Sequence, residues 1–211
     1  MTVTYASIKL GGKMASVEQT AKERFAKVFV KDDWTLFKEM ADINFAEAAT
    51  LTKSTFRKIP EQRRLLVRNV RKRLLIGIGT ELLIKAAYLK SGYAINKLQD
   101  SASGPKCPYR LADVEPQQLN PYDTFTLAQL TDQLRKVLPQ LSPTSVLEGL
   151  RVAKVFRNKE GHVVTRTHRF DPSSYRAIER ALVEIYSCAF GEDLSVRFAV
   201  AHGERGTWRV S

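Results

Sequence analysis

Cysteine and histidine are scarce in this sequence, which argues against a fold held together by disulfides or by a bound metal. The 211 residues include two cysteines, Cys107 and Cys188, and three histidines. Two cysteines are too few for a disulfide framework. No Cys-x-x-Cys pair is present, so we do not expect a zinc site, and we expect neither a metal nor another cofactor.

Long apolar runs are also missing. A membrane-spanning helix needs about 20 predominantly apolar residues, and no such run occurs. The first residues, MTVTYASIKLGGKMAS, do not follow the basic-then-apolar order of a signal peptide. We therefore expect no membrane partner and a cytoplasmic location.

Acidic residues are few compared with basic ones. Lysine and arginine total 34 and aspartate and glutamate 22, which gives a formal net charge of +12. Such an excess favours a polyanionic partner, because lysine and arginine displace counterions from phosphate backbones. We therefore expect an RNA partner. The simpler alternative is that the charge only keeps the chain in solution.

The pattern of apolar residues predicts a mainly α-helical fold. The strongest helix follows Pro60 and ends at Ser91-Gly92, with Gly77 and Gly79 inside it, where they would permit a close helix approach or a kink. Other helical patterns cover residues 17–30, 33–51, 126–138, 145–160 and 172–189. We divide the chain into an N-terminal extended segment (1–15), a helical domain (16–190) with a loop insertion (100–125), and a C-terminal β-hairpin (191–211). The hairpin is predicted from the strand-like alternation of Leu194, Val196 and Phe198.

One segment carries a combination of side chains suited to chemistry. Arg157 is followed directly by the polar Asn158, and His162 lies five positions after the arginine. On a continuous helix, residues five apart point about 140° away from each other. Gly161 is expected to end the helix, because glycine adopts the left-handed conformation readily, and His162 would then turn back towards Arg157.

Arginine and histidine are sufficient for cleaving RNA without a metal. Histidine titrates near neutral pH and transfers protons, while a guanidinium group holds a phosphate and stabilises its developing charge. The segment from Arg157 to His162 resembles the R-x4-6-H signature of the HEPN superfamily. Glu81, Lys85 and Ala86 are similar to the E-x3-K-A pattern on an earlier helix of the same family.

The HEPN resemblance covers about residues 35–190 and implies a HEPN-like helical bundle, usually a homodimer in which two motifs face each other. Active members are metal-independent endoribonucleases, common in toxin–antitoxin and anti-phage systems. It implies catalytic roles for Arg157, His162, Asn158 and Glu81. Asn158 would position Arg157 or the substrate, and Glu81 would orient a basic residue. Lys154 and Lys159, on the same segment, are expected to bind RNA.

Simpler interpretations of these residues exist. Arg157 and Lys159 also suit a helix C-terminus through the helix dipole, with Gly161 as a plain cap and His162 exposed. Glu81 and Lys85 also form an ordinary i,i+4 pair. A second R-x4-H match, Arg197 to His202, lies in a strand-like pattern, and we treat it as coincidence.

A basic run precedes and enters the long helix. Residues 53–73 hold nine basic side chains and one acidic one. Helical spacing predicts that four of them share a face and bind RNA: Arg64, Arg68, Arg71 and Lys72. The alternatives are binding of an acidic antitoxin and a merely solvated face.

The sequence thus predicts a metal-independent endoribonuclease that acts on RNA as a homodimer, with an antitoxin or a defence-complex protein as a further partner. The alternatives are a non-catalytic helical RNA-binding module and a subunit of a ribonucleoprotein defence complex.

Overall fold

A computed structural model of the chain describes residues 16–28, 33–99, 107–162 and 171–198. The fold is mainly helical with one small antiparallel sheet. The α-helices are α1 (Val17–Val28), α2 (Trp34–Thr50), α3 (Glu61–Lys90), α4 (Leu127–Val137), α5 (Pro143–His162) and α6 (Pro172–Ile185). The strands are β1 (Asn96–Leu98) and β2 (Leu119–Thr124). A π-helical turn, Tyr186–Phe190, follows α6 directly.

Short polar side chains set the starts of several helices. Asp33 accepts a hydrogen bond from the Leu36 backbone nitrogen at 3.1 Å and begins α2. Thr126 caps α4, and Asp171 caps α6 immediately before Pro172. These side chains satisfy backbone N–H groups that have no partner within the helix. The expected helix starts near Asp33 and at Asp171-Pro172 are confirmed.

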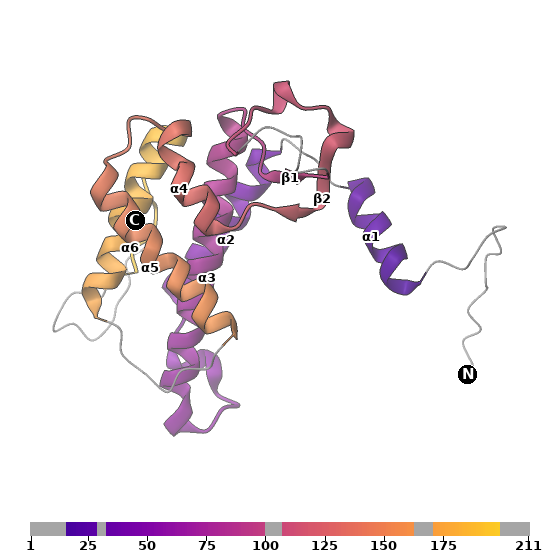
Figure 1. The fold of residues 1–211 in the computed structure, drawn as a ribbon. Coiled ribbons are helices and arrows are strands. Elements are labelled where there is room, and N and C mark those ends of the chain that lie inside the picture. Colours follow the sequence, from indigo (N-terminus) through magenta and orange to yellow (C-terminus); the bar gives the residue numbers. More distant parts are fainter. Residues whose placement is uncertain (1–15, 29–32, 100–106, 163–170, 199–211) are drawn as a thin grey trace, which may run out of the picture.

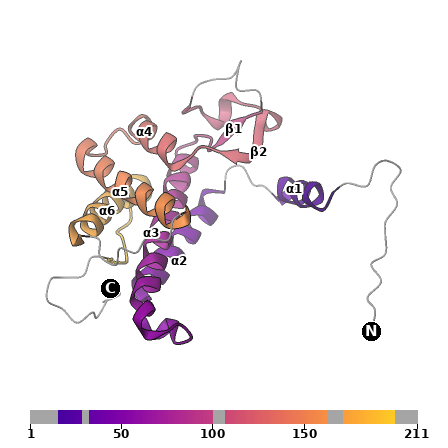
Figure 2. The ribbon, with the colours of Figure 1, turned by 60° about the horizontal axis from the view of Figure 1, so that its bottom comes forward.

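The 30-residue helix α3 is the centre of the bundle (Figure 1). It packs against α2, α4 and α5, and α5 packs in turn against α6. Turned by 60°, the molecule shows α4, α5 and α6 gathered beside α3, and α1 beyond the sheet and away from this group (Figure 2). The core joins Phe45 of α2, Ile84 of α3, Leu134 of α4, Phe156 of α5 and Ile178 of α6, all nearly inaccessible to solvent.

Two glycines let the neighbouring helices approach α3 closely. A Cβ atom placed on Gly77 would lie 2.6 Å from the Arg157 backbone nitrogen on α5. One placed on Gly79 would lie 2.6 Å from the Phe45 ring on α2. Both distances are too short for a real Cβ contact, so the helix–helix approach expected from these glycines is confirmed.

The sheet lies in the middle of the chain. β1 and β2 run antiparallel, with Asn96 opposite Thr124 and Leu98 opposite Leu119. Residues 111–113 and 116–118 form short 3-10 helices between them. The prediction of a plain loop over residues 100–125 is therefore wrong for the described part, residues 107–125.

The predicted C-terminal hairpin is not found in the part of it that the structure describes. Residues 191–198 contain no strand, although Leu194, Val196 and Phe198 alternate with exposed residues as expected. These side chains pack on the helices, and the Phe198 ring lies 5.5 Å from that of Phe45. The apolar alternation thus reflects packing on a helical core. Residues 199–211, and the N-terminal segment 1–15, lie outside the described residues.

Candidate functional site

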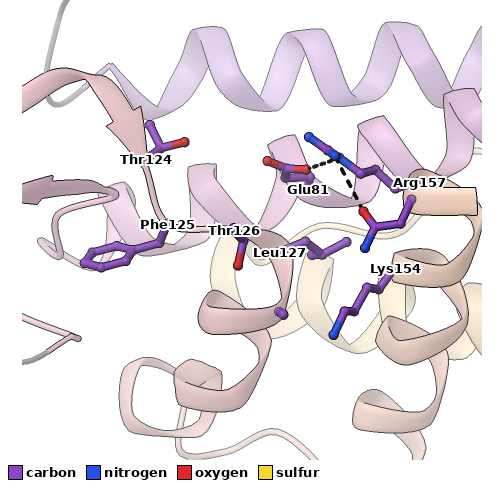
Figure 3. Close-up of a pocket in the computed structure, with 9 residues that line it drawn as sticks. Glu81, Thr124, Phe125, Thr126, Leu127, Lys154 and Arg157 are labelled. Atoms are coloured by element: carbon purple, nitrogen blue, oxygen red, sulfur yellow. Dashed lines mark hydrogen bonds and ion pairs between the residues drawn. The ribbon is translucent and has the colours of Figure 1, made fainter. Parts of the chain in front are cut away.

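A pocket of about 260 Å³ opens where α3, α5 and the junction between β2 and α4 meet (Figure 3). Glu81 comes from α3, and Lys154, Arg157 and Asn158 come from α5. Residues 124–128 form the opposite wall, which contains both hydroxyl and apolar side chains. Four of the expected site residues therefore line one hollow, although they are far apart in the sequence.

Arg157 is held in this pocket by Glu81. The Arg157 Nε atom donates to Glu81 Oε2 at 2.9 Å, and its Nη1 lies 3.5 Å from Asn158 Oδ1 (Figure 3). The Glu81 side chain is 13% exposed and that of Arg157 is 42% exposed. One edge of the guanidinium is thus tied to a nearly buried carboxylate, while a large part of the group remains accessible to solvent.

The same carboxylate is shared with a second cation. Lys85 Nζ lies 2.9 Å from Glu81 Oε1 and donates to Thr124 Oγ1 at 3.0 Å. Glu81 therefore carries one negative charge between two positive ones, and the cluster of Glu81, Lys85 and Arg157 has a net charge of +1. Because Lys85 is buried behind Glu81, the excess charge is exposed at Arg157. The i,i+4 pair expected on α3 is thus present and extends to the motif on α5.

Lys154 adds a further cation to the pocket. It lies three residues before Arg157 on α5, on an adjacent part of the helix surface, and is exposed. Two cationic side chains, a carboxamide from Asn158 and a hydroxyl from Thr126 therefore surround the hollow. This arrangement suits an anion with several oxygen atoms, such as a phosphate.

The histidine of the motif, His162, is the last residue of α5. α5 continues through Gly161 to His162, so the expected end of the helix at Gly161 is wrong. Positions 157 and 162 are therefore about 140° apart around the axis of α5. The side chains of Lys159 and His162 lie outside the described residues.

The basic run on α3 does not form the single exposed stripe that its spacing predicts. Arg64 donates to the backbone oxygens of Ile59 at 2.8 Å and Arg57 at 3.1 Å. Arg71 is exposed, and its Nε donates to Glu47 Oε1 at 2.9 Å. These two arginines hold the turn before α3 and the contact with α2.

Arg68 and Lys72 are also at least partly buried. Arg68 is half-buried, and its Nε lies 3.1 Å from Asn69 Oδ1. Lys72 is 6% exposed, donates to the Phe198 backbone oxygen at 2.9 Å and lies over the Tyr175 ring. Burial, helped by the charge of Arg68, lowers the pKa of Lys72 to about 7. The expectation that Lys72 belongs to an exposed face is therefore wrong, because tertiary packing covers it.

Three residues shape the pocket although the sequence-based interpretation did not assign them to the site. Gly77 fixes the distance between α3 and α5 at Arg157 itself. Thr124 links Lys85 to β2, and Thr126 begins α4 by accepting a hydrogen bond from the Gln129 backbone. The spacing of Thr126 and Gln129 is that of a capping box, which is a signal for a helix start at this wall of the pocket.

Within the described parts of the chain, no group of histidine, cysteine and acidic side chains is arranged to hold a metal ion. None of the described helices is both long and apolar enough to cross a membrane.

No family model, no curated protein and no solved structure matches this chain. The resemblance to the HEPN superfamily stays a prediction.

Proposed function

We propose that the chain is a metal-independent endoribonuclease of the HEPN type, of the kind found in toxin–antitoxin and anti-phage systems. The observation that supports this most directly is the contact between Glu81 and Arg157. It joins the two sequence fragments on which the resemblance is based and leaves a partly exposed guanidinium in a pocket. A carboxylate that orients an arginine in this way prepares it to bind a phosphate without further rearrangement.

In the proposed reaction, Arg157 holds the scissile phosphate. Its Nε is engaged by Glu81 and its Nη1 lies near Asn158, so the remaining N–H groups on its two terminal nitrogens are the ones that reach the phosphate oxygens. Lys154 adds positive charge on the same side of α5, and Asn158 keeps the guanidinium in place. Neutralising the charge that develops on the phosphate lowers the barrier to attack at phosphorus.

His162 supplies proton transfer in this proposal. A base removes the proton of the ribose 2′-hydroxyl, and the 2′-oxygen forms a bond to the adjacent phosphorus. The bond from phosphorus to the 5′-oxygen then breaks, and an acid gives that oxygen a proton. The products are a 2′,3′-cyclic phosphate and a 5′-hydroxyl. Histidine performs either step near neutral pH.

The continuity of α5 through His162 favours a site shared by two chains over a site within one chain. Positions 157 and 162 lie about 140° apart around the axis of α5, whereas position 162 of a second copy is not bound by that spacing. The proposal therefore includes a homodimer with a composite site in which each pocket receives His162 from the partner.

The same observation also favours a second candidate function, a non-catalytic RNA-binding module or a subunit of a ribonucleoprotein defence complex. If His162 reaches neither its own pocket nor that of a second copy, the pocket retains a phosphate-binding arginine but no group for proton transfer. RNA would then be bound and not cut.

The test is a ribonuclease assay in EDTA with identification of the product ends. Wild type is compared with Arg157→Ala, His162→Ala and the control Arg135→Ala, which removes an equal charge from an exposed site on α4 outside the pocket. EDTA-resistant cleavage to 2′,3′-cyclic phosphate ends, lost in both motif variants and kept in the control, would support the nuclease. If no RNA is cut, or if the motif variants cut as well as wild type, the nuclease is ruled out and only RNA binding remains.

Co-expression of the two inactive variants tests the shared site. In a mixed dimer of Arg157→Ala and His162→Ala chains, one composite pocket has both an intact arginine and an intact histidine. Recovered cleavage would therefore support histidine from the partner chain. Mixed dimers without activity would instead indicate that each chain uses its own pair.

A further inference from the structure

A second hollow, of about 560 Å³, lies along α6 and is separate from the pocket at Arg157. Arg176 and Arg180 of α6 and Arg197 of the segment after the π-helical turn line it. All three side chains are exposed. We call this hollow, with these three arginines, the α6 groove.

The arginines of the α6 groove remain available for a ligand. Neither Arg176 nor Arg180 has an ion pair or a hydrogen bond with the residues that the structure describes. Arg197 donates from Nη1 to the backbone oxygens of Leu194 at 3.0 Å and Val196 at 3.3 Å, which fixes its direction, and no described carboxylate forms an ion pair with it. This differs from the basic run on α3, where Arg71 has a carboxylate partner.

The two carboxylates in the groove are engaged by other groups. Glu184 accepts from Ser145 Oγ at 2.7 Å and from the Ser142 backbone nitrogen at 3.0 Å. Glu179 accepts from the Phe198 backbone nitrogen. Glu184 lies four residues after Arg180, the usual distance for a helical ion pair, yet no such pair forms. The carboxylates therefore support the local structure and do not occupy the guanidinium groups.

The α6 groove cannot be an extension of the pocket. Ser145 lines the groove and Arg157 lines the pocket, and both are on α5. Twelve residues of helix separate them by about 18 Å along the axis and about 120° around it. A ligand in the groove therefore uses a different face of the bundle.

We propose that the α6 groove binds the sugar–phosphate backbone of single-stranded RNA, at a site beyond the proposed cleavage pocket. Arg176 and Arg180 are about 6 Å apart along the helix axis, which allows contacts to neighbouring phosphates of one strand. Guanidinium groups bind phosphate oxygens in pairs and are favoured at phosphate-binding sites.

The mixed lining favours RNA over an acidic protein segment. Ribose 2′-hydroxyls donate hydrogen bonds, and the hydroxyl oxygens of Ser145 and Ser173 provide acceptors for them beside the arginines. The side chains of an acidic segment offer no donor, so they could not use the acceptors that ribose hydroxyls use. A strand that combines phosphates with hydroxyls matches both kinds of lining residue.

The test is a fluorescence-anisotropy titration of the full-length chain with labelled oligouridine in EDTA, at several salt concentrations. Gel electrophoresis shows whether the probe stays intact. Arg176→Gln/Arg180→Gln is compared with Arg135→Gln/Lys136→Gln, which removes the same charge from exposed positions on α4 that line neither hollow. Thermal melting by circular dichroism shows that both double variants are folded.

We expect the groove variant to bind at least tenfold more weakly, and the control to lose less than threefold. The slope of log K against log salt should fall in magnitude by about 1.4 for the groove variant, because each phosphate contact on a single strand contributes about 0.7. Equal losses in the two double variants, or wild type that does not bind the probe, would overturn the proposal. So would a hexaglutamate peptide that displaces RNA as well as unlabelled oligouridine does. A missing cleavage activity would leave this result untouched, since binding alone is measured.

Discussion

The two halves of α3 use charged side chains in different ways. In the first half, Arg64 binds backbone oxygens, Arg71 binds Glu47 and Lys72 is buried against Phe198. In the second half, Glu81 and Lys85 form a nearly buried pair that holds Arg157 at the edge of a pocket. The first half thus turns these three cations towards other parts of the fold, and the second half keeps a cation of another helix accessible.

The number of charges in a segment therefore does not show whether they can meet a ligand. The basic run has many cations, but its neighbours provide backbone oxygens and a carboxylate for several of them. The pocket at Arg157 has few cations, and its one carboxylate is balanced by Lys85. What distinguishes the halves is the partner of each charge, which depends on tertiary packing.

The largest expected effect is in the second half of α3, at Gly77. In Gly77→Ala, the added methyl group would meet the Arg157 backbone at 2.6 Å, so α5 must move away. We expect a loss of about 1–3 kcal/mol in the free energy of unfolding. A shift of about 1 Å at Arg157 should also lower RNA cleavage by on the order of 100-fold. Urea denaturation and the EDTA-resistant ribonuclease assay measure the two effects.

Gly79→Ala is the matched control for that substitution. Its methyl group meets the Phe45 ring on α2 and not the backbone of α5. It should cost a similar amount of stability but leave the cleavage rate of the folded protein within about threefold of wild type. Equal losses of cleavage in the two variants would show that Gly77 acts only through stability, and that the contact of α3 with α5 matters no more for cleavage than its contact with α2.

Lys72 in the first half gives an effect that depends on pH. Its pKa is about 7 in the folded chain and 10.5 in its ordinary state, so between these values the unfolded chain holds the extra proton. Stability then rises with pH, by at most about 1.4 kcal/mol per pH unit from this group. The loss of folding stability caused by burying the charged Lys72 is fully present below pH 7 and disappears as the pH approaches 10.5.

This contribution is measured by urea denaturation of wild type and Lys72→Met between pH 7 and 8.5. That range stays below the ordinary pKa values of Tyr88 and Tyr186 and of the cysteine thiols, which burial raises. The difference in free energy of unfolding, wild type minus variant, should increase with pH. A difference that stays constant over this range would mean that Lys72 keeps its proton and lies in a more polar environment.

Local signals in the sequence were enough to predict most helices. Aspartate before an apolar pattern marks the starts of α2 and α6, and Pro60 and Ser91 delimit α3. The resemblance led us to expect that Glu81 orients a basic residue, and in the structure Glu81 pairs with both Lys85 and Arg157. Capping residues act over one helical turn, which is why a sequence shows them directly.

Features that depend on distant parts of the chain were not predictable. β1 has only three residues, too few for a strand pattern, and it pairs with a segment that contains Pro121. The alternation of Leu194, Val196 and Phe198 is shared by a strand and by an extended segment packed on helices. Helical spacing places Lys72 beside Arg68 and Arg71, but only the position of Phe198 decides that Lys72 is buried.

The smallest expected effect concerns Arg71 in the first half of α3, which can be released from its carboxylate partner by a single substitution. Arg71 is 53% exposed and its partner Glu47 is 39% exposed, so their pair should contribute less than about 1 kcal/mol to stability. Glu47→Gln removes the competing carboxylate and leaves Arg71 free. If the partner of a cation decides its availability, this variant should bind oligouridine about two- to threefold more tightly, and the double variant Glu47→Gln/Arg71→Gln should lose that gain.

Fluorescence anisotropy at constant salt measures both, with Glu39→Gln, an exposed acid elsewhere on α2, as the charge-matched control. An equal gain from Glu39→Gln would mean that net charge, and not the pairing of Arg71, governs RNA binding at this face.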